Sequence, residues 1–269
     1  MEPKLFDIHS HLNLSAFNED WPEVLDRTLT ADCWTITVGA DLASSKKAVE
    51  IANSVPEGVW ATVGFHPTDA ADLSDEAWNE VVELANDPKV VAVGECGLEY
   101  YRIVKSEELK VKSNQKELFR RHIELALSLN KPLMIHCRAS EGNQDAYEDA
   151  IEILNEYKKE AGKKLRGDFH FFAGNWAVAQ KCLELGFTLS FTGVITFANQ
   201  YDEVIKNTPL DMLMAETDAP FVAPALYRGK RCEPLYVAEV VKKLAELKGI
   251  PKEKMDEITV QNARQMFGV

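Results

Sequence analysis

The sequence has few cysteines and no excess of positive charge. Its five cysteines are scattered over 269 residues and never form a C-x-x-C pair, so neither a disulfide framework nor a cysteine-based zinc site is indicated. Lys and Arg total 30 against 43 Asp and Glu, which gives a formal net charge of −13. This balance argues against a protein that binds nucleic acid through a broad basic surface.

Long apolar segments are also missing. No stretch approaches the roughly 20 apolar residues of a membrane span, and the N-terminal residues lack the basic start and apolar run of a secretory signal. No tract rich in proline, glycine or serine divides the chain, so we expect residues 1–269 to form one domain. Together with the cysteine pattern, these absences predict a cytoplasmic protein with neither a membrane partner nor an obligate protein partner.

The chain does contain a regular alternation of short apolar runs and longer segments of helical period. The apolar runs, rich in Val, Ile and Phe, predict strands at Leu5–Ile8, Trp34–Val38, Val59–Val63, Val90–Val93, Pro132–Ile135, Gly167–Phe169, Thr188–Phe191 and Met212–Ala215. Apolar residues three or four positions apart predict helices, among them Asp75–Asn86, Gln115–Leu129, Ala146–Lys159, Trp176–Leu185 and Leu235–Leu247. Buried strands joined by helices form parallel sheets. Eight such units in about 250 residues predict the α/β class, as a single (β/α)8 TIM barrel.

Histidines are concentrated at the ends of these predicted strands. Five of the six follow a strand directly: His9, His11, His66, His136 and His170. Two carboxylates have the same location, Glu95 after the fourth strand and Asp218 after the eighth. Because the C-terminal ends of barrel strands converge on one mouth, where active sites lie, we expect these side chains to meet. The sixth histidine, His122, lies in a predicted helix, and we expect it on a solvated face.

These side chains are suited to binding metal ions. Residues two apart on a strand point the same way, so His9 and His11 can bind one ion together. Imidazole and carboxylate ligands suit Zn²⁺ or Mn²⁺, and a carboxylate-rich site also accepts Mg²⁺. One open catalytic ion takes fewer ligands than are present, so we expect two divalent ions, with Glu95 as the carboxylate that bridges them. The predicted ligands are His9, His11, Glu95, His136, His170 and Asp218.

Several short motifs follow one another along the chain. They are Asp7-x-His9-x-His11, Gly64-Phe65-His66-Pro67, Gly94-Glu95-Cys96-Gly97-Leu98, His136-x-Arg138, His170-Phe171-Phe172-Ala173-Gly174 and Glu216-Thr217-Asp218-Ala219-Pro220. With closing motifs at 228–234 and 262–267, the series resembles the TatD family of metal-dependent deoxyribonucleases, from Asp7 to Phe267. The resemblance implies a TIM barrel of the amidohydrolase superfamily, a centre of one or two metals, and hydrolysis of phosphodiester bonds in DNA. It also implies the same six ligands.

The chain departs from the usual family pattern beside two of these ligands. Glu99 stands where the family usually has Asp, and Phe171-Phe172-Ala173 stand where a Cys-Phe-Ser series is usual. Phe171 and Ala173 remove polar groups near the sixth strand. Because loops at this face shape the substrate pocket, these positions bear on substrate choice.

Our hypothesis for the reaction is attack of a metal-bound hydroxide on phosphorus, with Glu95 and Asp218 as catalytic residues. Asp218 would orient the hydroxide and take its proton, a role that the family resemblance also implies. The residues assigned to substrate phosphate are His66, Arg138, Arg228, Lys230 and Arg231. Since the chain as a whole is acidic, we expect weak, salt-sensitive binding of single-stranded DNA or strand ends.

Other functions remain open from the sequence. The same centre could cleave a carboxylic ester or amide, for example in an aminoacyl-tRNA, although the fourth strand ends in Glu95 rather than the modified lysine of many amidases. A barrel that binds metal without catalysis is a further alternative. Four aromatic residues, Tyr100, Tyr101, Trp176 and Phe197, could stack on bases, but packing over the barrel end is the more common role of such side chains.

Overall fold

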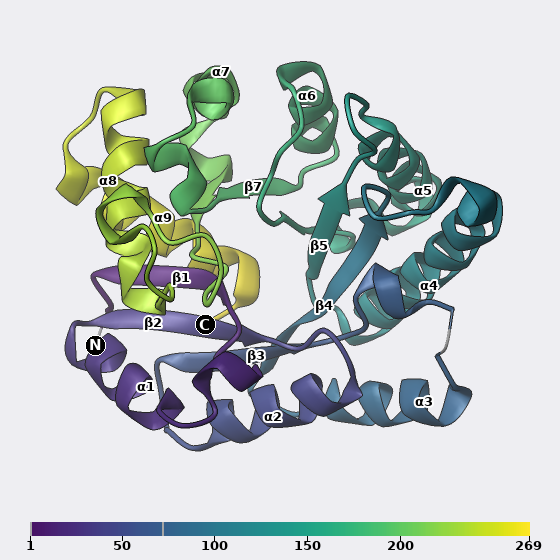
Figure 1. The fold of residues 1–269 in the computed structure, drawn as a ribbon, viewed down its shortest axis with the longest axis horizontal. Helices are drawn as coiled ribbons and strands as arrows, with labels where there is room; N and C mark the ends of the chain where they lie inside the picture. Colours follow the sequence, from purple (N-terminus) through teal and green to yellow (C-terminus); the bar gives the residue numbers. More distant parts are fainter. Residues whose placement is uncertain (1, 72) are drawn as a thin grey trace.

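The computed structural model describes residues 2–71 and 73–269, so Met1, the first residue of the predicted domain, and Asp72 lie outside it. Eight parallel strands form one sheet in chain order, and helices surround it (Figure 1). The strands are β1 Leu5–Ser10, β2 Cys33–Val38, β3 Val59–Val63, β4 Val90–Glu99, β5 Leu133–Arg138, β6 Gly167–Phe169, β7 Thr188–Phe191 and β8 Leu213–Ala215. The α-helices are α1 Trp21–Thr30, α2 Leu42–Asn53, α3 Asp75–Leu84, α4 Glu108–Leu129, α5 Asp145–Ala161, α6 Trp176–Glu184, α7 Asp202–Asn207, α8 Val237–Lys248 and α9 Lys252–Phe267.

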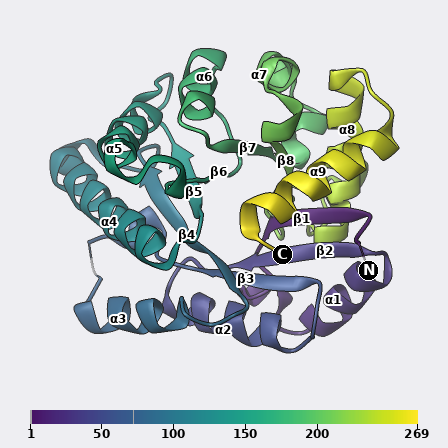
Figure 2. The same cartoon turned by 180° about the vertical axis from the view of Figure 1, so that it is seen from behind.

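The predicted (β/α)8 barrel is confirmed. All of the predicted strands occur, and the five predicted helices correspond to α3, α4, α5, α6 and α8. Seen from behind, the helices form an outer ring while α9 crosses the end of the barrel near β1 and β2 (Figure 2). The main differences are that β1, β4 and β5 run further than predicted, to Ser10, Glu99 and Arg138. His9, Glu95 and His136 therefore lie on rigid strands rather than on the loops after them.

The barrel closes where β1 meets the segment that follows β8. The amide of Asp218 donates to the carbonyl of His9 at 2.8 Å, and the amide of His11 donates to the carbonyl of Ala219 at 2.7 Å. Few backbone pairs form at this junction, because β8 already ends at Ala215 and the contact with β1 is made by the residues after it. Two predicted metal ligands from opposite ends of the sequence are thus joined through their own backbone.

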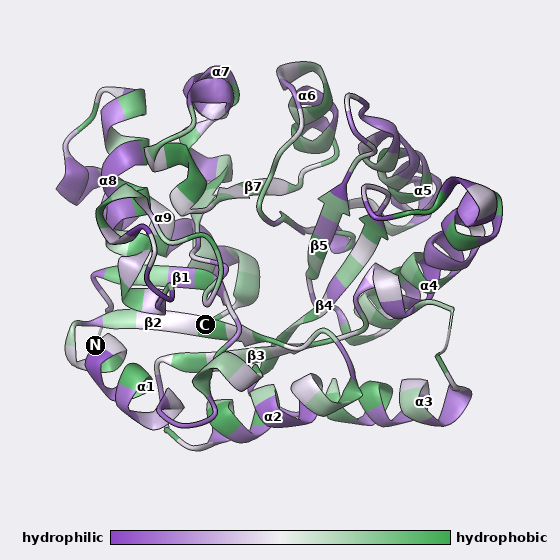
Figure 3. Cartoon of the chain, viewed as in Figure 1, coloured by the Kyte–Doolittle hydropathy of each residue, from purple (hydrophilic) through white to green (hydrophobic). Residues whose placement is uncertain are grey.

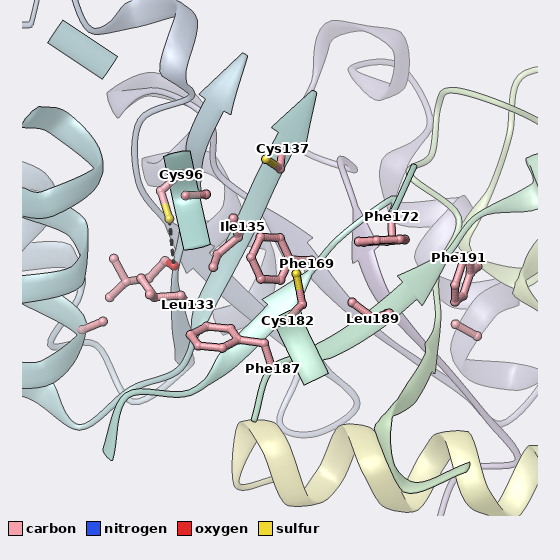
Figure 4. Packing of buried hydrophobic residues seen from close by; sticks show 14 of the residues in the cluster. Cys96, Leu133, Ile135, Cys137, Phe169, Phe172, Cys182, Phe187, Leu189 and Phe191 are labelled. Atoms are coloured by element: carbon pink, nitrogen blue, oxygen red, sulfur yellow. Dashed lines mark hydrogen bonds between the residues drawn. The ribbon is translucent and has the colours of Figure 1, made fainter. Parts of the chain in front are cut away.

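Apolar side chains fill two layers, inside the barrel and between its strands and the helices. The strands are coloured mainly as apolar or neutral, whereas several helices alternate between apolar and polar residues (Figure 3). In the outer layer Phe169 of β6 and Leu189 of β7 pack near Cys182 of α6 (Figure 4). The five cysteines are free and buried. No α-helix within the described ranges is long and apolar enough to cross a membrane.

Shifts of strand register aim two of the predicted ligands into the barrel. In β1 the register shifts between Asp7 and Ser10, so Ile8 belongs to the interior cluster and the next residue, His9, also faces the mouth. In β4 the register shifts between Val93 and Cys96, on either side of Glu95. Such irregularities re-aim a side chain that strict alternation would turn outward, and they are common beside active sites.

Candidate metal centre

The six predicted ligands come together at the C-terminal mouth of the barrel, in two groups of atoms. The first group contains His9, His11 and Asp218, whose ligand atoms lie within 4.8 Å of one another. Nε2 of His9 is 3.1 Å from Nε2 of His11, which is 3.3 Å from Oδ1 of Asp218. Oε2 of Glu95 is 3.8 Å from each of these two Nε2 atoms. All four side chains therefore converge on one point.

The second group uses the other oxygen of Glu95. Oε1 of Glu95 lies 3.0 Å from Nδ1 of His136 and 3.1 Å from Nε2 of His170. These two ring nitrogens are 3.3 Å apart. Glu95 thus turns one oxygen toward each group, which is the geometry a carboxylate needs to bridge two metal ions.

The outward-facing nitrogen of two of these histidines has a hydrogen-bond partner that fixes the ring. Nδ1 of His11 is 2.9 Å from the carbonyl oxygen of Val38, and Nε2 of His136 is 3.1 Å from Oε2 of Glu99. An N–H held by an oxygen leaves the opposite nitrogen with a free lone pair, and metal ligands are oriented in this way. Sequence reasoning noted Glu99 only as a departure from the family pattern and did not predict its contact with His136.

The other two histidines share one buried carboxylate, Glu216. The rings of His9 and His170 are stacked, and Oε2 of Glu216 lies 3.8 Å from Nδ1 of His9 and 3.7 Å from Nδ1 of His170. None of these three buried atoms has a hydrogen-bond partner among the described residues. Sequence reasoning missed this contact, although Glu216 lies directly after β8, two positions before Asp218.

These observations fit divalent cations. Burial, and then the neighbouring charge of His170, lowers the pKa of His9 well below its ordinary value. Burial opposes ionisation of Glu95, but the charges and hydrogen bonds of His170 and His136 outweigh it and hold the pKa of Glu95 well below its usual range. The neutral ring of His9 and the ionised carboxylate of Glu95 are thus each in the state that binds metal.

His66, after β3, presents a hydrogen-bond donor to the same cavity. Its Nδ1 accepts the amide of Thr68 at 3.3 Å, so the neutral ring carries its proton on Nε2, which is 3.8 Å from Oε1 of Glu95. Burial, and then the proximity of His136, lowers the pKa of His66 to about 4. His66 is therefore suited to donate to an anionic oxygen.

The cluster forms the floor of a cavity of about 690 Å³, whose wall has two different halves. Loops after β2 to β5 contribute polar side chains, including Asp41, Thr68, Asp69, Arg102 and Arg138. Loops after β6, β7, β8 and β1 contribute mainly apolar ones: Leu14, Phe171, Ala173, Tyr201, Phe221 and Val222.

The cationic residues assigned to phosphate do not all reach this cavity. Arg138 lines it, with its guanidinium 4.0 Å from the ring centre of Tyr101. Arg228 and Lys230 are exposed but lie outside the residues that line the cavity. The guanidinium of Arg231 forms hydrogen bonds of 2.6 and 2.7 Å with Asp20, which hold it against the β1 loop. Arg102, which sequence reasoning did not select, lines the polar half instead.

The expectation of a solvated face for His122 is wrong. Its side chain is fully buried, with Nδ1 2.8 Å from the carbonyl oxygen of Leu118 and Nε2 accepting the amide of Phe65 at 3.0 Å. His122 therefore anchors α4 to the end of β3, directly before His66. The helical period does place His122 on the apolar face, four residues after Leu118 and three after Phe119. Only its partner, a backbone amide far away in the sequence, had no local signal.

Four aromatic residues were considered for base stacking, and the side chains of two of them, Tyr100 and Trp176, instead pack into the protein. Tyr100 is buried, and its hydroxyl donates to Asp149 at 2.8 Å. Trp176 is half-buried against the core. Tyr101 and Phe197 are 52% and 44% exposed, so they keep a free ring surface.

A model of the family described as TatD related DNase matches residues 6–268. The chain is 39% identical over 268 residues to an uncharacterised metal-dependent hydrolase, YabD, of Bacillus subtilis, and the match covers 98% of this chain and 99% of that one. It is 31% identical over 271 residues to a 3'-5' ssDNA/RNA exonuclease TatD of Pectobacterium parmentieri, with the same coverage.

Solved structures show the same fold. The chain superposes on YjjV, a TatD homologue of Escherichia coli, with a TM-score of 0.87 at 24% identity, over 100% of both chains. A TatD family hydrolase of Entamoeba histolytica gives a TM-score of 0.83 at 24% identity, over 99% of each chain. The whole barrel is thus a shared architecture.

Proposed function

The chain belongs to the family of TatD-related DNases, and from that premise we propose that it is a metal-dependent nuclease that hydrolyses phosphodiester bonds of DNA at single-stranded ends. The observation that carries the proposal is the floor of the cavity, where Glu95 turns one oxygen toward each of two groups of histidines. The relative from Pectobacterium parmentieri is named an exonuclease on single-stranded DNA and RNA, which supports this substrate class.

We propose two divalent ions, Zn²⁺, Mn²⁺ or Mg²⁺, as the cofactors. Four side chains would hold the first ion: His9, His11, Asp218 and Glu95. Glu95, His136 and His170 would hold the second. Such ions supply Lewis acidity, which lowers the pKa of water and offsets phosphate charge.

The remaining steps are assigned to the side chains of this chain. Asp218 takes a proton from the attacking water, because its carboxylate is at the cavity surface and beside His11. The Nε2 proton of His66 and the guanidinium of Arg138 donate to non-bridging phosphate oxygens. Glu99 and Glu216 orient His136, His9 and His170.

The dimensions and charge of the site favour a strand end over a duplex. Pockets for small molecules are about 300–1,000 Å³, so a cavity of about 690 Å³ admits one or two nucleotides. With a net charge of −13, affinity must come from the few cationic groups of the cavity and the bound ions, which gives weak and salt-sensitive binding. The five free, buried cysteines support a cytoplasmic location.

One panel of substrates tests the proposal. Purified protein is incubated with Zn²⁺, Mn²⁺ or Mg²⁺ and an end-labelled single strand, a blunt duplex, an aryl ester or a cyclic amide. We expect metal-dependent shortening of the single strand from its end, and slower attack on the blunt duplex. Turnover of only the ester or amide would overturn the nuclease proposal in favour of an esterase or amidase. No turnover of any substrate would favour a binding protein.

A further inference from the structure

Phe221 is an unusual residue of the cavity wall because an aromatic side chain is left half in solvent beside the candidate metal centre. It lines the cavity and is 50% exposed. Its ring centre is 6.2 Å from that of His11, and the two planes meet at 71°. Because this ring lines the cavity beside a candidate metal ligand, a ligand that enters the cavity can cover its exposed face.

The backbone holds Phe221 in this position. Its amide donates to the carbonyl of Asp218 at 2.8 Å, which closes a tight turn. The next residue, Val222, has φ of 44°, a left-handed value that is a genuine outlier for a β-branched residue. A Cβ on Gly193 would lie 2.7 Å from the carbonyl oxygen of Val222, so only glycine lets the loop after β7 support the turn. Strain of this kind persists where a function requires it.

A second aromatic residue, Phe171, extends the same apolar half. It also has a positive φ, 46°, and its amide donates to Oε1 of Glu216 beneath the metal centre. Ala173, two residues further on, is exposed in the same wall. Phe171 and Ala173 thus keep this half of the wall apolar beside Phe221.

We propose that the apolar half of the wall, formed by Phe171, Ala173, Tyr201, Phe221 and Val222, is a nucleobase-binding subsite in which a base of the substrate stacks on Phe221. The inference rests on the proposed nuclease function and adds to it where the base lies. Asp218 and Phe221 belong to one turn, so the phosphate at the metal centre and the base on Phe221 belong to the same or adjacent nucleotides. The polar half is left for the sugar-phosphate backbone.

Stacking also sets the specificity. Every base has an aromatic face, whereas discrimination between bases needs hydrogen-bonding groups at their edges. Among the side chains named for this half, only that of Tyr201 carries a polar group. The subsite therefore requires a base but accepts any of the four.

The test combines a variant with a substrate that lacks the same contact. Single strands carry one abasic unit at each of the last three nucleotides in turn, and kcat/KM is measured for the wild type, Phe221→Ala and Phe221→Tyr. We expect roughly a 10-fold or larger loss for Phe221→Ala on the intact strand, and activity close to wild type for Phe221→Tyr, which retains stacking. At one position the abasic unit should lower the wild-type rate by a similar factor and leave Phe221→Ala unchanged.

Phe197→Ala is the matched control. Phe197 is a similarly exposed aromatic residue, 44% exposed, that packs against Arg228 outside the cavity wall. An equal loss for Phe197→Ala, or an abasic effect as large in Phe221→Ala as in the wild type at all three positions, would overturn the subsite. Absence of strand cleavage by the wild type would instead overturn the nuclease function, so the two failures are distinguishable.

Discussion

The imidazole rings of His9 and His170 stack with their centres 3.8 Å apart and an angle of 13° between their planes. The two residues belong to different groups of the proposed metal centre, and Glu216 faces Nδ1 of both. A change in the orientation of one ring would therefore move the other ring. We expect the two proposed ion sites to be coupled through this stack and this carboxylate.

Replacing the shared carboxylate should weaken both metal sites. Glu216→Gln keeps the size of the side chain but removes the charge that faces the two N–H groups. We expect a loss of roughly 10- to 100-fold in affinity for each ion, as is typical of groups that orient metal ligands. Calorimetric titration of metal-free protein, with elemental analysis after dialysis, measures this directly.

Glu99→Gln provides the comparison for that variant. Glu99 contacts His136 alone among the six predicted ligands, so only one of the two binding steps should weaken. Equal weakening of both steps in Glu99→Gln, or of a single step in Glu216→Gln, would contradict the coupling.

Removing the proposed base should abolish turnover and leave the fold intact. Asp218 has φ of 56°, a region that Asn also tolerates, so Asp218→Asn preserves the backbone turn. We expect kcat to fall roughly 10²- to 10⁴-fold. Circular dichroism and thermal unfolding confirm the fold; a variant that retains more than a tenth of wild-type turnover would exclude Asp218 as the base.

Arg138 should account for part of the affinity for phosphate. Arg138→Ala removes a donor from the cavity wall, and a hydrogen bond to a charged group is worth about 1.5–3 kcal/mol, so KM should rise roughly 10-fold or more. The dependence of KM on salt should also become shallower by about 0.7 in a plot of log KM against log salt. Arg120→Ala is the control, because Arg120 pairs with Glu156 on the outer helices. Identical effects of the two variants would exclude a specific phosphate contact.

The buried His122 should make folding stability depend on pH. Burial lowers the pKa of His122 to about 4, whereas an unfolded histidine titrates near 6.5. Between these values the unfolded chain binds more protons, so the stability contributed by neutral His122 is present above about pH 6.5 and is lost as the pH falls to about 4. At about pH 5 the loss is about 2 kcal/mol.

Denaturant unfolding in the presence of a chelator tests this point. The free energy of unfolding of wild type and His122→Gln is compared at about pH 7.5 and about pH 5, since Gln keeps a donor and an acceptor but does not titrate. The wild type should lose more stability than the variant. Equal losses in the free energy of unfolding of the two proteins would show that groups other than His122 cause the pH dependence.

The sequence predicted the barrel and the convergence of the six candidate ligands because both follow from local patterns. Strands buried on both faces are continuous apolar runs, and in a barrel the end of every strand faces one mouth. The position of His136 directly after an apolar run was therefore enough to place it beside His170.

Contacts across the barrel could not be predicted in this way. Glu216 precedes Asp218 by two residues, but nothing local shows that its carboxylate lies beneath two imidazoles from other strands. His122 lies on the apolar face of α4, but nothing local shows that it accepts the amide of Phe65, in the loop after β3. Arg231 lies in a basic run, and only the tertiary structure pairs it with Asp20. Each of these depends on which residues the closed sheet brings together.

The junction between β1 and the segment after β8 is held by one isolated bridge, between Ser10 and Ala219, rather than by two paired strands. The backbone hydrogen bonds of Asp218 with His9, and of His11 with Ala219, close the barrel. They also hold the proposed metal ligands in position. Local opening of the barrel between β1 and the segment after β8 would therefore also separate His9 and His11 from Asp218. We therefore expect loss of bound ion, rapid deuterium uptake at these amides and loss of turnover to occur together, before the rest of the protein unfolds.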